Sequence, residues 1–533
     1  MQAATPENPT PDLYFELITH AKPERANRMC VVVSDLHFTD GTVGFQNLGD
    51  YAWEAFYSTI LQRCLTYRIH ELVLVLDGDI VDMIRSSKWA EKGIYPWERD
   101  RKECFSAVVN AILKDVIDVQ HANFFKLLRD LEGRLTADTH RLDRRTAFKK
   151  VKIVVTVGNH DKELLCDNAA LTYFYEQGLG IKLTDIEPER RQMMGRMYGD
   201  ETMFDSVKTA PYLPFYYGDT GFRFFTTHGQ WRDPDNSAVV AADPDKGLPG
   251  WSAKDGWTLA VWQKLKFSPF LLPCFGDTVA AGVLSTFIYK TKIAMDQQNC
   301  HDPVIDSILD ELDLYRPTYA AIERILEVAA KNRAAQTNLD AVQIIEDKLY
   351  ECLLDWLGWD FTLQSSPPLR RVALIAAKWL LKLMSLFGHS LRISVIGGLI
   401  KLLKIGNVHD TPPTFNEMAT FPSFLPAYRH YGFQIHGEGH THVPLQGEAN
   451  IDNEKYASTY INFGTWRDQI VLREKQGYRR RGTLRSLFIL DLENLTESKD
   501  RFPRSFDYFV SDAITWSDLN DNTHEVGKNS AKI

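Results

Sequence analysis

The chain has 533 residues, of which 44% are hydrophobic and 25% charged, and its 61 basic and 70 acidic residues give a formal net charge of −9. This length accommodates about three to four domains, or one large domain that carries an insertion. The composition is that of a globular protein with a sizeable core, which excludes a mostly disordered chain. The negative charge argues against a surface built as a whole to hold nucleic acid.

The cysteines and the apolar runs indicate in which cellular compartment the protein is expected. The seven cysteines are scattered and never form a C-x-x-C pair, which indicates neither a disulfide framework nor a cysteine zinc site and favours a reducing cytoplasm. The N-terminal stretch lacks a positively charged start followed by an apolar run, so we expect no secretory signal. No uninterrupted apolar stretch reaches the length of about 18 residues that a membrane-spanning helix needs.

Short apolar, β-branched runs bounded by polar residues predict buried strands. In chain order they are 29–35, 72–79, 151–160, 222–229, 432–440, 458–466 and 486–494. Segments of helical character separate the first of them, for example 51–68 and 102–132. Strand, helix, strand is the pattern of an α/β fold.

Metal-capable or proton-transferring side chains stand where five of these predicted strands end. They are Asp35 and His37; Asp79, with Asp82 three residues further on; Asn159, His160 and Asp161; His228; and His440 and His442. Sites of α/β proteins assemble at the carboxyl ends of strands, because rigid strands position the loops that follow them. Each residue alone is equally a polar turn residue, and H-x-H alone is equally a pair of surface histidines, but five coincidences in order favour a site.

These blocks resemble the five motifs of the calcineurin-like metallophosphoesterases, D-x-H, G-D-x-x-D, G-N-H-D, a histidine after a strand, and G-H-x-H. Here they read Asp35-Leu36-His37, Gly78-Asp79-Ile80-Val81-Asp82, Gly158-Asn159-His160-Asp161, His228-Gly229 and Gly439-His440-Thr441-His442. The resemblance implies an α/β fold built on a β-sandwich flanked by helices. It also implies a hydrolase that cleaves a phosphoric ester or pyrophosphate bond by two-metal activation of water.

Seven of these side chains supply four imidazoles, two carboxylates and one amide oxygen, enough for two metal ions that share a carboxylate. By resemblance, Asp79 bridges the two ions; one is held by Asp35, His37, Asp79 and His442, and the other by Asp79, Asn159, His228 and His440. A nitrogen and oxygen set without thiolate suits manganese, iron, zinc or cobalt and argues against calcium. By the same resemblance, the two expected metal ions are Mn²⁺ or Fe²⁺/Zn²⁺.

Three further residues of the blocks have expected roles outside the ligand set. His160 is expected to protonate the leaving oxygen or to hydrogen-bond a phosphoryl oxygen. Asp161 is expected to orient the imidazole of His160, and Asp82 to brace its loop.

The interval between His228 and His440 is far longer than a simple connection needs. Helical patterns at about 257–292 and 304–358 predict a helical insertion or cap. We therefore expect the following organisation: a catalytic domain in two parts, 28–232 and 431–495, a helical insertion, 233–430, and a polar, loosely ordered C-terminal tail, 496–533.

Segment 369–406 of the insertion contains seven basic residues and no acidic residue. A basic, amphipathic, tryptophan-bearing segment is typical of a helix in a membrane interface, and equally of a cap helix that is buried while its lysines reach water. A helical cap at this place is similar to that of the UDP-2,3-diacylglucosamine pyrophosphatases. It predicts a phosphorylated substrate that is lipid-linked or membrane-proximal, and a cytoplasmic protein that associates peripherally with membranes.

Two alternatives to this function stay open. A soluble nucleotide or nucleic-acid phosphodiesterase uses the same chemistry, although the net charge disfavours nucleic acid as a partner. A non-catalytic scaffold can share the fold, although such proteins typically lack a metal ligand or the histidine of G-N-H-D, and none is missing here.

Overall fold

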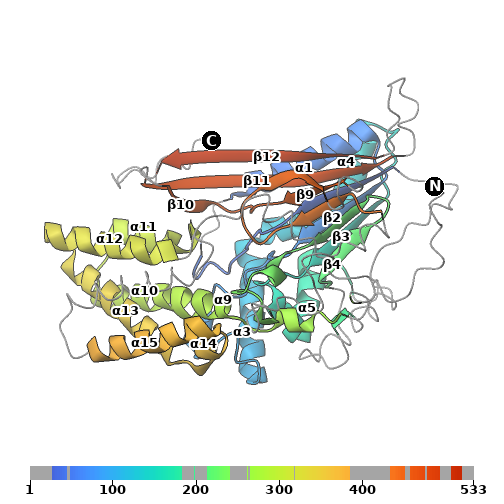
Figure 1. The fold of residues 1–533 in the computed structure, drawn as a ribbon. Helices are drawn as coiled ribbons and strands as arrows, with labels where there is room; N and C mark the ends of the chain where they lie inside the picture. The colour runs from blue at the N-terminus through green and yellow to red at the C-terminus, as the bar shows by residue number, and fades with distance from the viewer. Residues whose placement is uncertain are drawn as a thin grey trace.

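The structure is a computed structural model, and it describes residues 27–44, 48–182, 197–198, 213–239, 261, 265–316, 319–384, 432–450, 457–473, 477–492 and 506–518. The protein is mixed α/β, as the sequence predicts. Two β-sheets are flanked by helices, and a second group of helices lies beside them (Figure 1).

The larger sheet has seven strands in the order β3-β2-β1-β11-β10-β6, with β12 paired to β11. They are β1 (Arg28–Val33), β2 (Glu71–Asp77), β3 (Lys150–Thr156), β6 (Tyr315–Arg316), β10 (Gln469–Arg473), β11 (Gly477–Asp491) and β12 (Phe506–Asp518). The first three are parallel, and β11 runs antiparallel to β1. β1 and β2 are buried along almost their whole length, which explains why their sequences are continuous apolar runs.

The smaller sheet has five strands in the order β4-β5-β7-β9-β8. They are β4 (Tyr216–Asp219), β5 (Phe224–Thr227), β7 (Ile435–Glu438), β8 (Leu445–Asn450) and β9 (Ala457–Asn462). β5, β7 and β9 are parallel, so their carboxyl ends meet at one edge. One apolar core joins both sheets, and the hydroxyl of Thr226 in β5 donates to the carboxylate of Asp77 in β2 at 2.7 Å.

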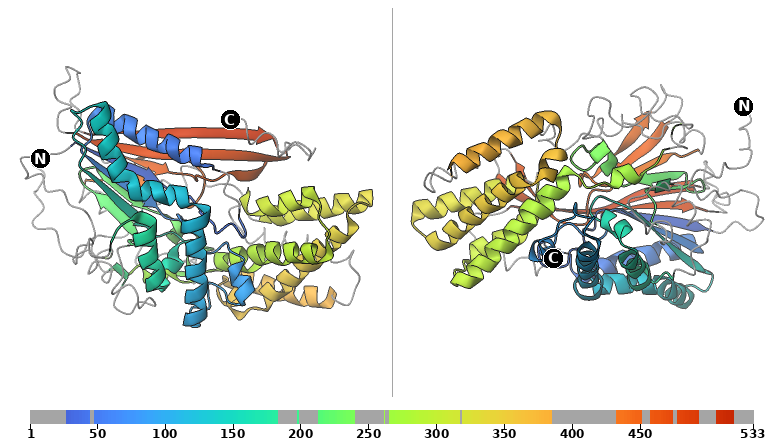
Figure 2. Two further views of the ribbon diagram at one scale, coloured as in Figure 1. Left: turned by 180° about the vertical axis from the view of Figure 1, so that it is seen from behind. Right: turned by 90° about the horizontal axis from the view of Figure 1, so that it is seen from below.

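Helices of the first half of the chain surround the larger sheet on one side and extend toward the insertion. They are α1 (Asp50–Tyr67), α2 (Lys88–Lys92), α3 (Lys102–Lys114), η1 (Asp115–Gln120), α4 (Ala122–Leu142), η2 (Lys162–Cys166), α5 (Asn168–Tyr173) and η3 (Phe174–Leu179). Seen from behind, α1 and α4 lie over the strands (Figure 2). The indole of Trp53 in α1 stacks on that of Trp466 with ring centroids 5.4 Å apart, which ties this layer to the loop after β9.

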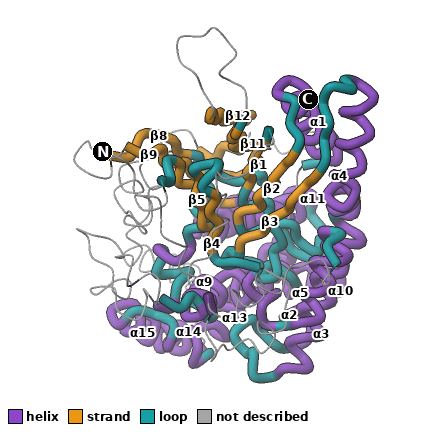
Figure 3. Tube along the Cα trace, turned by 90° about the vertical axis from the view of Figure 1, so that its right-hand side faces the viewer, coloured by secondary structure: helices purple, strands orange, loops and turns teal. Residues whose placement is uncertain are grey.

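The predicted helical insertion is present in the described residues. After η6 (Gln230–Arg232) and η7 (Ser268–Leu271), it contains α9 (Phe275–Asp277), η8 (Thr278–Ser285), α10 (Thr286–Gln298), α11 (Pro303–Glu311), η9 (Leu312–Leu314), α12 (Tyr319–Ala335), α13 (Leu339–Gly358), α14 (Asp360–Gln364) and α15 (Pro368–Met384). These helices have their own apolar core, built around α13, and α13, α14 and α15 lie away from the strands (Figure 3). Residues 385–406 of the basic segment lie outside the described residues.

The structure differs from the predicted domain boundaries in two places. The insertion is not purely helical, because β6 adds a strand to the larger sheet, with Tyr315 paired to Ile470. The predicted polar tail contains β12, which pairs with β11 along thirteen residues. Every second residue from Phe506 to Trp516 is apolar except Asp512, an approximate period of two that predicts a strand and that the polar flanks of the tail obscured.

One helical stretch in the described part of the chain, Ser268–Gln298, has the length and apolar composition to cross a membrane. Of its most apolar window, 72% is buried within the protein. Packing against α13 accounts for this apolar character, because the core of the insertion requires it.

Candidate metal centre

The seven predicted ligands follow five strands whose carboxyl ends meet. Asp35 and His37 follow β1, Asp79 follows β2 and Asn159 follows β3; His228 follows β5, and His440 and His442 follow β7. Five of the seven have left-handed backbone, with φ between 48° and 63°: Asp35, His37, Asp79, His440 and His442. Such conformations cost about 1–3 kcal/mol each and concentrate at functional sites, where the surrounding structure enforces them.

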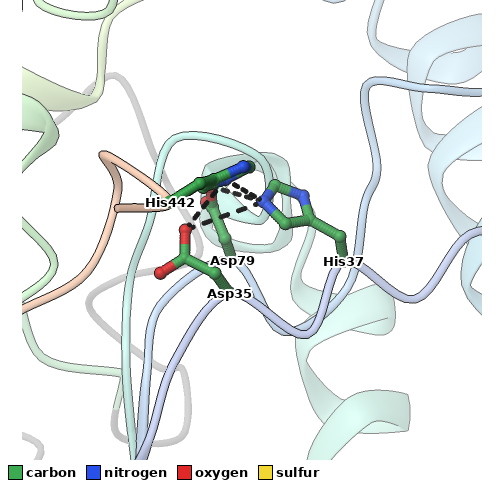
Figure 4. A group of neighbouring side chains, drawn as sticks. All are labelled: Asp35, His37, Asp79 and His442. Atoms are coloured by element: carbon green, nitrogen blue, oxygen red, sulfur yellow. Dashed lines mark hydrogen bonds and ion pairs between the residues drawn. The ribbon is translucent and has the colours of Figure 1, made fainter. Parts of the chain in front are cut away.

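A first group consists of Asp35, His37, Asp79 and His442, whose ligand atoms all lie within 4.8 Å of one another. The Nε2 atoms of His37 and His442 are 2.8 Å apart, and His442 Nε2 is 3.1 Å from Asp35 Oδ1. Figure 4 shows both imidazoles directed at the two carboxylates. All four residues are buried.

A second group consists of Asp79, His228 and His440, so Asp79 belongs to both groups. His228 Nε2 is 3.2 Å from Asp79 Oδ2. The amide oxygen of Asn159 lies 3.0 Å from His440 Nδ1, which places the fourth predicted ligand beside this group. The structure thus brings together all seven side chains, and its two groups are those that the resemblance implied.

The hydrogen bonds behind the ligands fix which nitrogen faces the centre. His228 Nδ1 lies 2.8 Å from the carbonyl oxygen of Asp77, so a neutral ring donates there and turns a lone pair on Nε2 toward Asp79. That buried Nε2 has no hydrogen-bond partner among the described residues. A lone pair facing a carboxylate is unfavourable unless a proton or a cation stands between them. The donor set therefore fits a metal ion.

The same geometry appears at His37. Its Nδ1 is 3.1 Å from the carboxylate of Asp82, which leaves Nε2 for the first group. A carboxylate behind a ligating histidine orients the ring and makes the inner nitrogen more basic.

The charges of the site are strongly coupled. Burial raises the pKa values of Asp35 and Asp79, but neighbouring histidines, His228 foremost, outweigh burial and hold both pKa values below the ordinary range. Burial lowers the pKa of His228, but the carboxylates of Asp79 and Asp35 outweigh it and raise this pKa to about 10. A site that draws a proton onto His228 so strongly also attracts a metal cation.

Two glycines permit this close packing. A Cβ atom on Gly158 would lie 2.1 Å from Asp79 Oδ1, and one on Gly439 would lie 2.1 Å from the hydroxyl oxygen of Ser34. The backbone of G-N-H-D and of G-H-x-H therefore approaches the carboxylates at distances that only glycine allows.

His160 lies beside the centre, but its predicted partner is wrong. The backbone N–H of His160 donates to Asp79 Oδ1 at 2.8 Å, and its ring Nδ1 lies 2.8 Å from Asp82 Oδ1. Asp161 instead accepts the backbone N–H groups of Gly158 at 2.6 Å and Ile80 at 3.0 Å. Asp161 thus holds two loops together, and Asp82 orients the imidazoles of both His160 and His37.

Sequence reasoning missed one carboxylate at the centre. Asp233 Oδ2 lies 3.0 Å from His440 Nε2. Burial raises the pKa of Asp233, but the hydrogen bond from His440 outweighs burial and lowers this pKa below its ordinary value. Asp233 follows the 3₁₀ turn η6 at the predicted start of the insertion, five residues after His228. No motif marks it, and only the turn brings it back to the site.

No protein-family model, curated protein or solved structure matches this chain.

Proposed function

We propose that this protein is a metal-dependent phosphoesterase of the calcineurin-like type, which hydrolyses a phosphate ester or pyrophosphate bond with two divalent ions, Mn²⁺ or Fe²⁺/Zn²⁺. The observation that carries the proposal is the convergence of two buried ligand groups on one shared carboxylate, Asp79. Two sheets around a common core, with the site at their strand ends, also fit the β-sandwich of that family.

Divalent ions held there would supply the positive charge that attracts an anionic phosphate. They would also lower the pKa of water, so that hydroxide is available near neutral pH to attack phosphorus. The residues of the chain have separate tasks. Asp35, Asp79, Asn159 and the four histidines would hold the ions, and Asp82 fixes the rings of His37 and His160. Because Nδ1 of His160 faces Asp82, Nε2 is the atom that meets substrate, where a protonated ring donates to a phosphoryl or leaving oxygen.

Replacement of the shared carboxylate tests the proposal. We expect the wild-type protein to bind divalent metal, measured by elemental analysis and calorimetry, and to hydrolyse an aryl phosphodiester with Mn²⁺. Asp79→Asn is expected to reduce both metal affinity and turnover by more than about 100-fold. Asp50→Asn, an exposed site in α1, removes the same charge as a control. Full activity of Asp79→Asn would refute the two-metal mechanism.

A wild-type protein that binds metal and hydrolyses no phosphoester would instead favour the scaffold alternative. Turnover of soluble nucleotide diesters in preference to acylated ones would favour the soluble phosphodiesterase.

We also propose that the substrate lies at a membrane surface, which the cytoplasmic protein reaches through α15. This helix buries Leu374, Ala377 and Leu381 in the core of the insertion. Its other face exposes apolar side chains to solvent, namely Leu369 (89%), Val372 (68%), Ile375 (40%), Trp379 (68%), Leu380 (47%) and Leu383 (57%). Exposed apolar side chains beside basic residues support an interfacial helix over a fully buried cap.

Flotation with anionic liposomes tests this second proposal. Trp379→Glu combined with Leu383→Glu is expected to abolish flotation of a wild-type protein that floats. Val119→Glu changes a comparably exposed apolar residue, 64% exposed, at a place outside α15. Equal flotation of all three proteins, or none by the wild type, would contradict the membrane role of α15.

A further inference from the structure

Three arginines from distant parts of the sequence gather beside the first ligand group. Arg85 follows the G-D-x-x-D block, Arg316 belongs to β6 of the insertion, and Arg467 follows β9. Arg85 and Arg467 are 7% and 2% exposed, and Arg316 is half-buried. Pairing of β6 with β10, in which Arg316 stands opposite Val471, fixes the position of the insertion's arginine.

The contacts of these arginines connect them to the metal ligands. Arg85 Nη1 is 3.4 Å from the same Asp82 oxygen that lies 3.1 Å from His37 Nδ1. Thr465 and Trp466, which precede Arg467, both donate to the backbone oxygen of Asp35. The arginine cluster, defined as Arg85, Arg316 and Arg467, therefore lies on the outer side of His37 and Asp35.

The cluster holds more positive than negative charge. Asp313 pairs with Arg467 and lies 4.0 Å from Arg85, and Asp82 is shared between Arg85 and two histidines. Burial, together with the charges of Arg85 and Arg467, lowers the pKa of Arg316 to about 9. Crowding of like charges in a buried place is costly unless an anion compensates it.

Arg85 also has buried donors that make no hydrogen bond. Its Nε and Nη1 atoms donate to no described group, although Nη1 lies at ion-pair distance, 3.4 Å, from Asp82. Unsatisfied donors of a guanidinium that is more than nine-tenths buried are rare, and their planar arrangement matches the oxygens of a phosphate.

On this basis, and resting on the proposed phosphoesterase function, we propose that the arginine cluster binds a second phosphate group of the substrate, next to the one that is hydrolysed. The substrate class is then a diphosphate ester. Arg85 is connected to the ligand groups through Asp82 and the ring of His37, so it serves a group adjacent to the one at the metal ligands. Arg316 makes the insertion part of the recognition site.

Kinetics on two probes test the inference. The first is an aryl ester of a nucleoside diphosphate, and the second is an aryl phosphodiester with one phosphate. Arg316→Gln is expected to raise KM for the diphosphate by at least about 10-fold more than it raises KM for the single-phosphate ester. Arg316→Lys is expected to restore part of the loss, because it keeps the charge but not the planar donors. Arg324→Gln, which removes an arginine of α12 paired with Glu327, is the control.

Calorimetry with inorganic pyrophosphate on the metal-free protein gives an independent readout. Wild type is expected to bind it at least 10-fold more tightly than Arg316→Gln, with both proteins melting at similar temperatures. Equal binding, or equal KM values for the diphosphate, would overturn the inference while leaving the phosphoesterase proposal intact. Failure of the wild type to hydrolyse either ester would refute the proposed function, and the pyrophosphate titration would still decide whether the cluster binds phosphate.

Discussion

A buried ion pair joins the G-N-H-D loop to the insertion, and its removal is our most quantitative prediction. Lys162 follows the loop, and its Nζ lies 2.7 Å and 2.9 Å from the two carboxylate oxygens of Asp277 in α9. The two side chains are 1% and 3% exposed. Burial lowers the pKa of Lys162, but the charge of Asp277 outweighs burial and raises this pKa, so Lys162 stays protonated. Lys162→Met leaves the carboxylate of Asp277 buried without its cation.

The magnitude follows from the geometry. At 2.7 Å and an effective dielectric constant of about 20, the attraction is about 6 kcal/mol, and most of it offsets the desolvation of two ions. Loss of one partner of such a pair costs about 3–5 kcal/mol of the free energy of unfolding. The double variant Lys162→Met with Asp277→Leu removes both charges. Its free energy of unfolding is therefore expected to lie only about 1–2 kcal/mol below that of the wild type. This difference is the hydrogen bond that Asp277 accepts from the N–H of Cys274 at 2.9 Å.

Urea unfolding of the wild type, both single variants and the double variant measures this coupling. Tryptophan fluorescence and far-UV circular dichroism must give coincident curves before free energies are compared in a chain of this length. Hydrogen exchange at 158–166 reports whether the loop loosens in the single variant. A single variant that costs less than about 1 kcal/mol, or a double variant as unstable as the sum of the singles, would refute the reasoning.

Three further changes have defined outcomes. Burial lowers the pKa of His121 to about 4 in the folded protein. The unfolded chain therefore protonates this histidine at a higher pH than the folded chain does. Up to about 3 kcal/mol of the free energy of unfolding is lost as the pH falls from about 6.5 to 4. His121→Phe should flatten urea-midpoint curves in that range, and an unchanged slope would contradict this. Gly158→Ala is expected to weaken metal binding by at least about 10-fold, because its Cβ atom would collide with Asp79. Gly133→Ala in α4 has open space around it, so it is expected to raise the free energy of unfolding by up to about 1 kcal/mol. Asp82→Asn is expected to lower metal affinity by about 10- to 100-fold in a calorimetric titration, and an unchanged affinity would rule out its orienting role.

The strands of the core could be predicted from the sequence because burial on both faces leaves a local signal. Each of the seven predicted runs overlaps a strand: β1, β2, β3, β5, β7, β9 and β11. Five of the described strands were missed: β4, β6, β8, β10 and β12. β4 is buried but has only four residues, β6 has two, and β12 lies in a region that is polar overall.

The ligand set was predictable for a related reason. Each predicted ligand lies within four residues of the end of a strand, and parallel strands bring their carboxyl ends together without further information. The structure confirms the gathering of the seven side chains, while the identity and number of the ions stay a proposal.

The sequence alone therefore determined the α/β class, the strands of the core and the residues at their ends, because these depend on local periodicity and on residues adjacent in the chain. Only the tertiary structure decided which carboxylate supports which histidine, because the directions of Asp82 and Asp161 depend on loops from different strands. It alone also placed Arg85, Arg316 and Arg467 together across 382 residues of chain, since such contacts arise from strand pairing between distant segments and leave no pattern in the sequence around each residue.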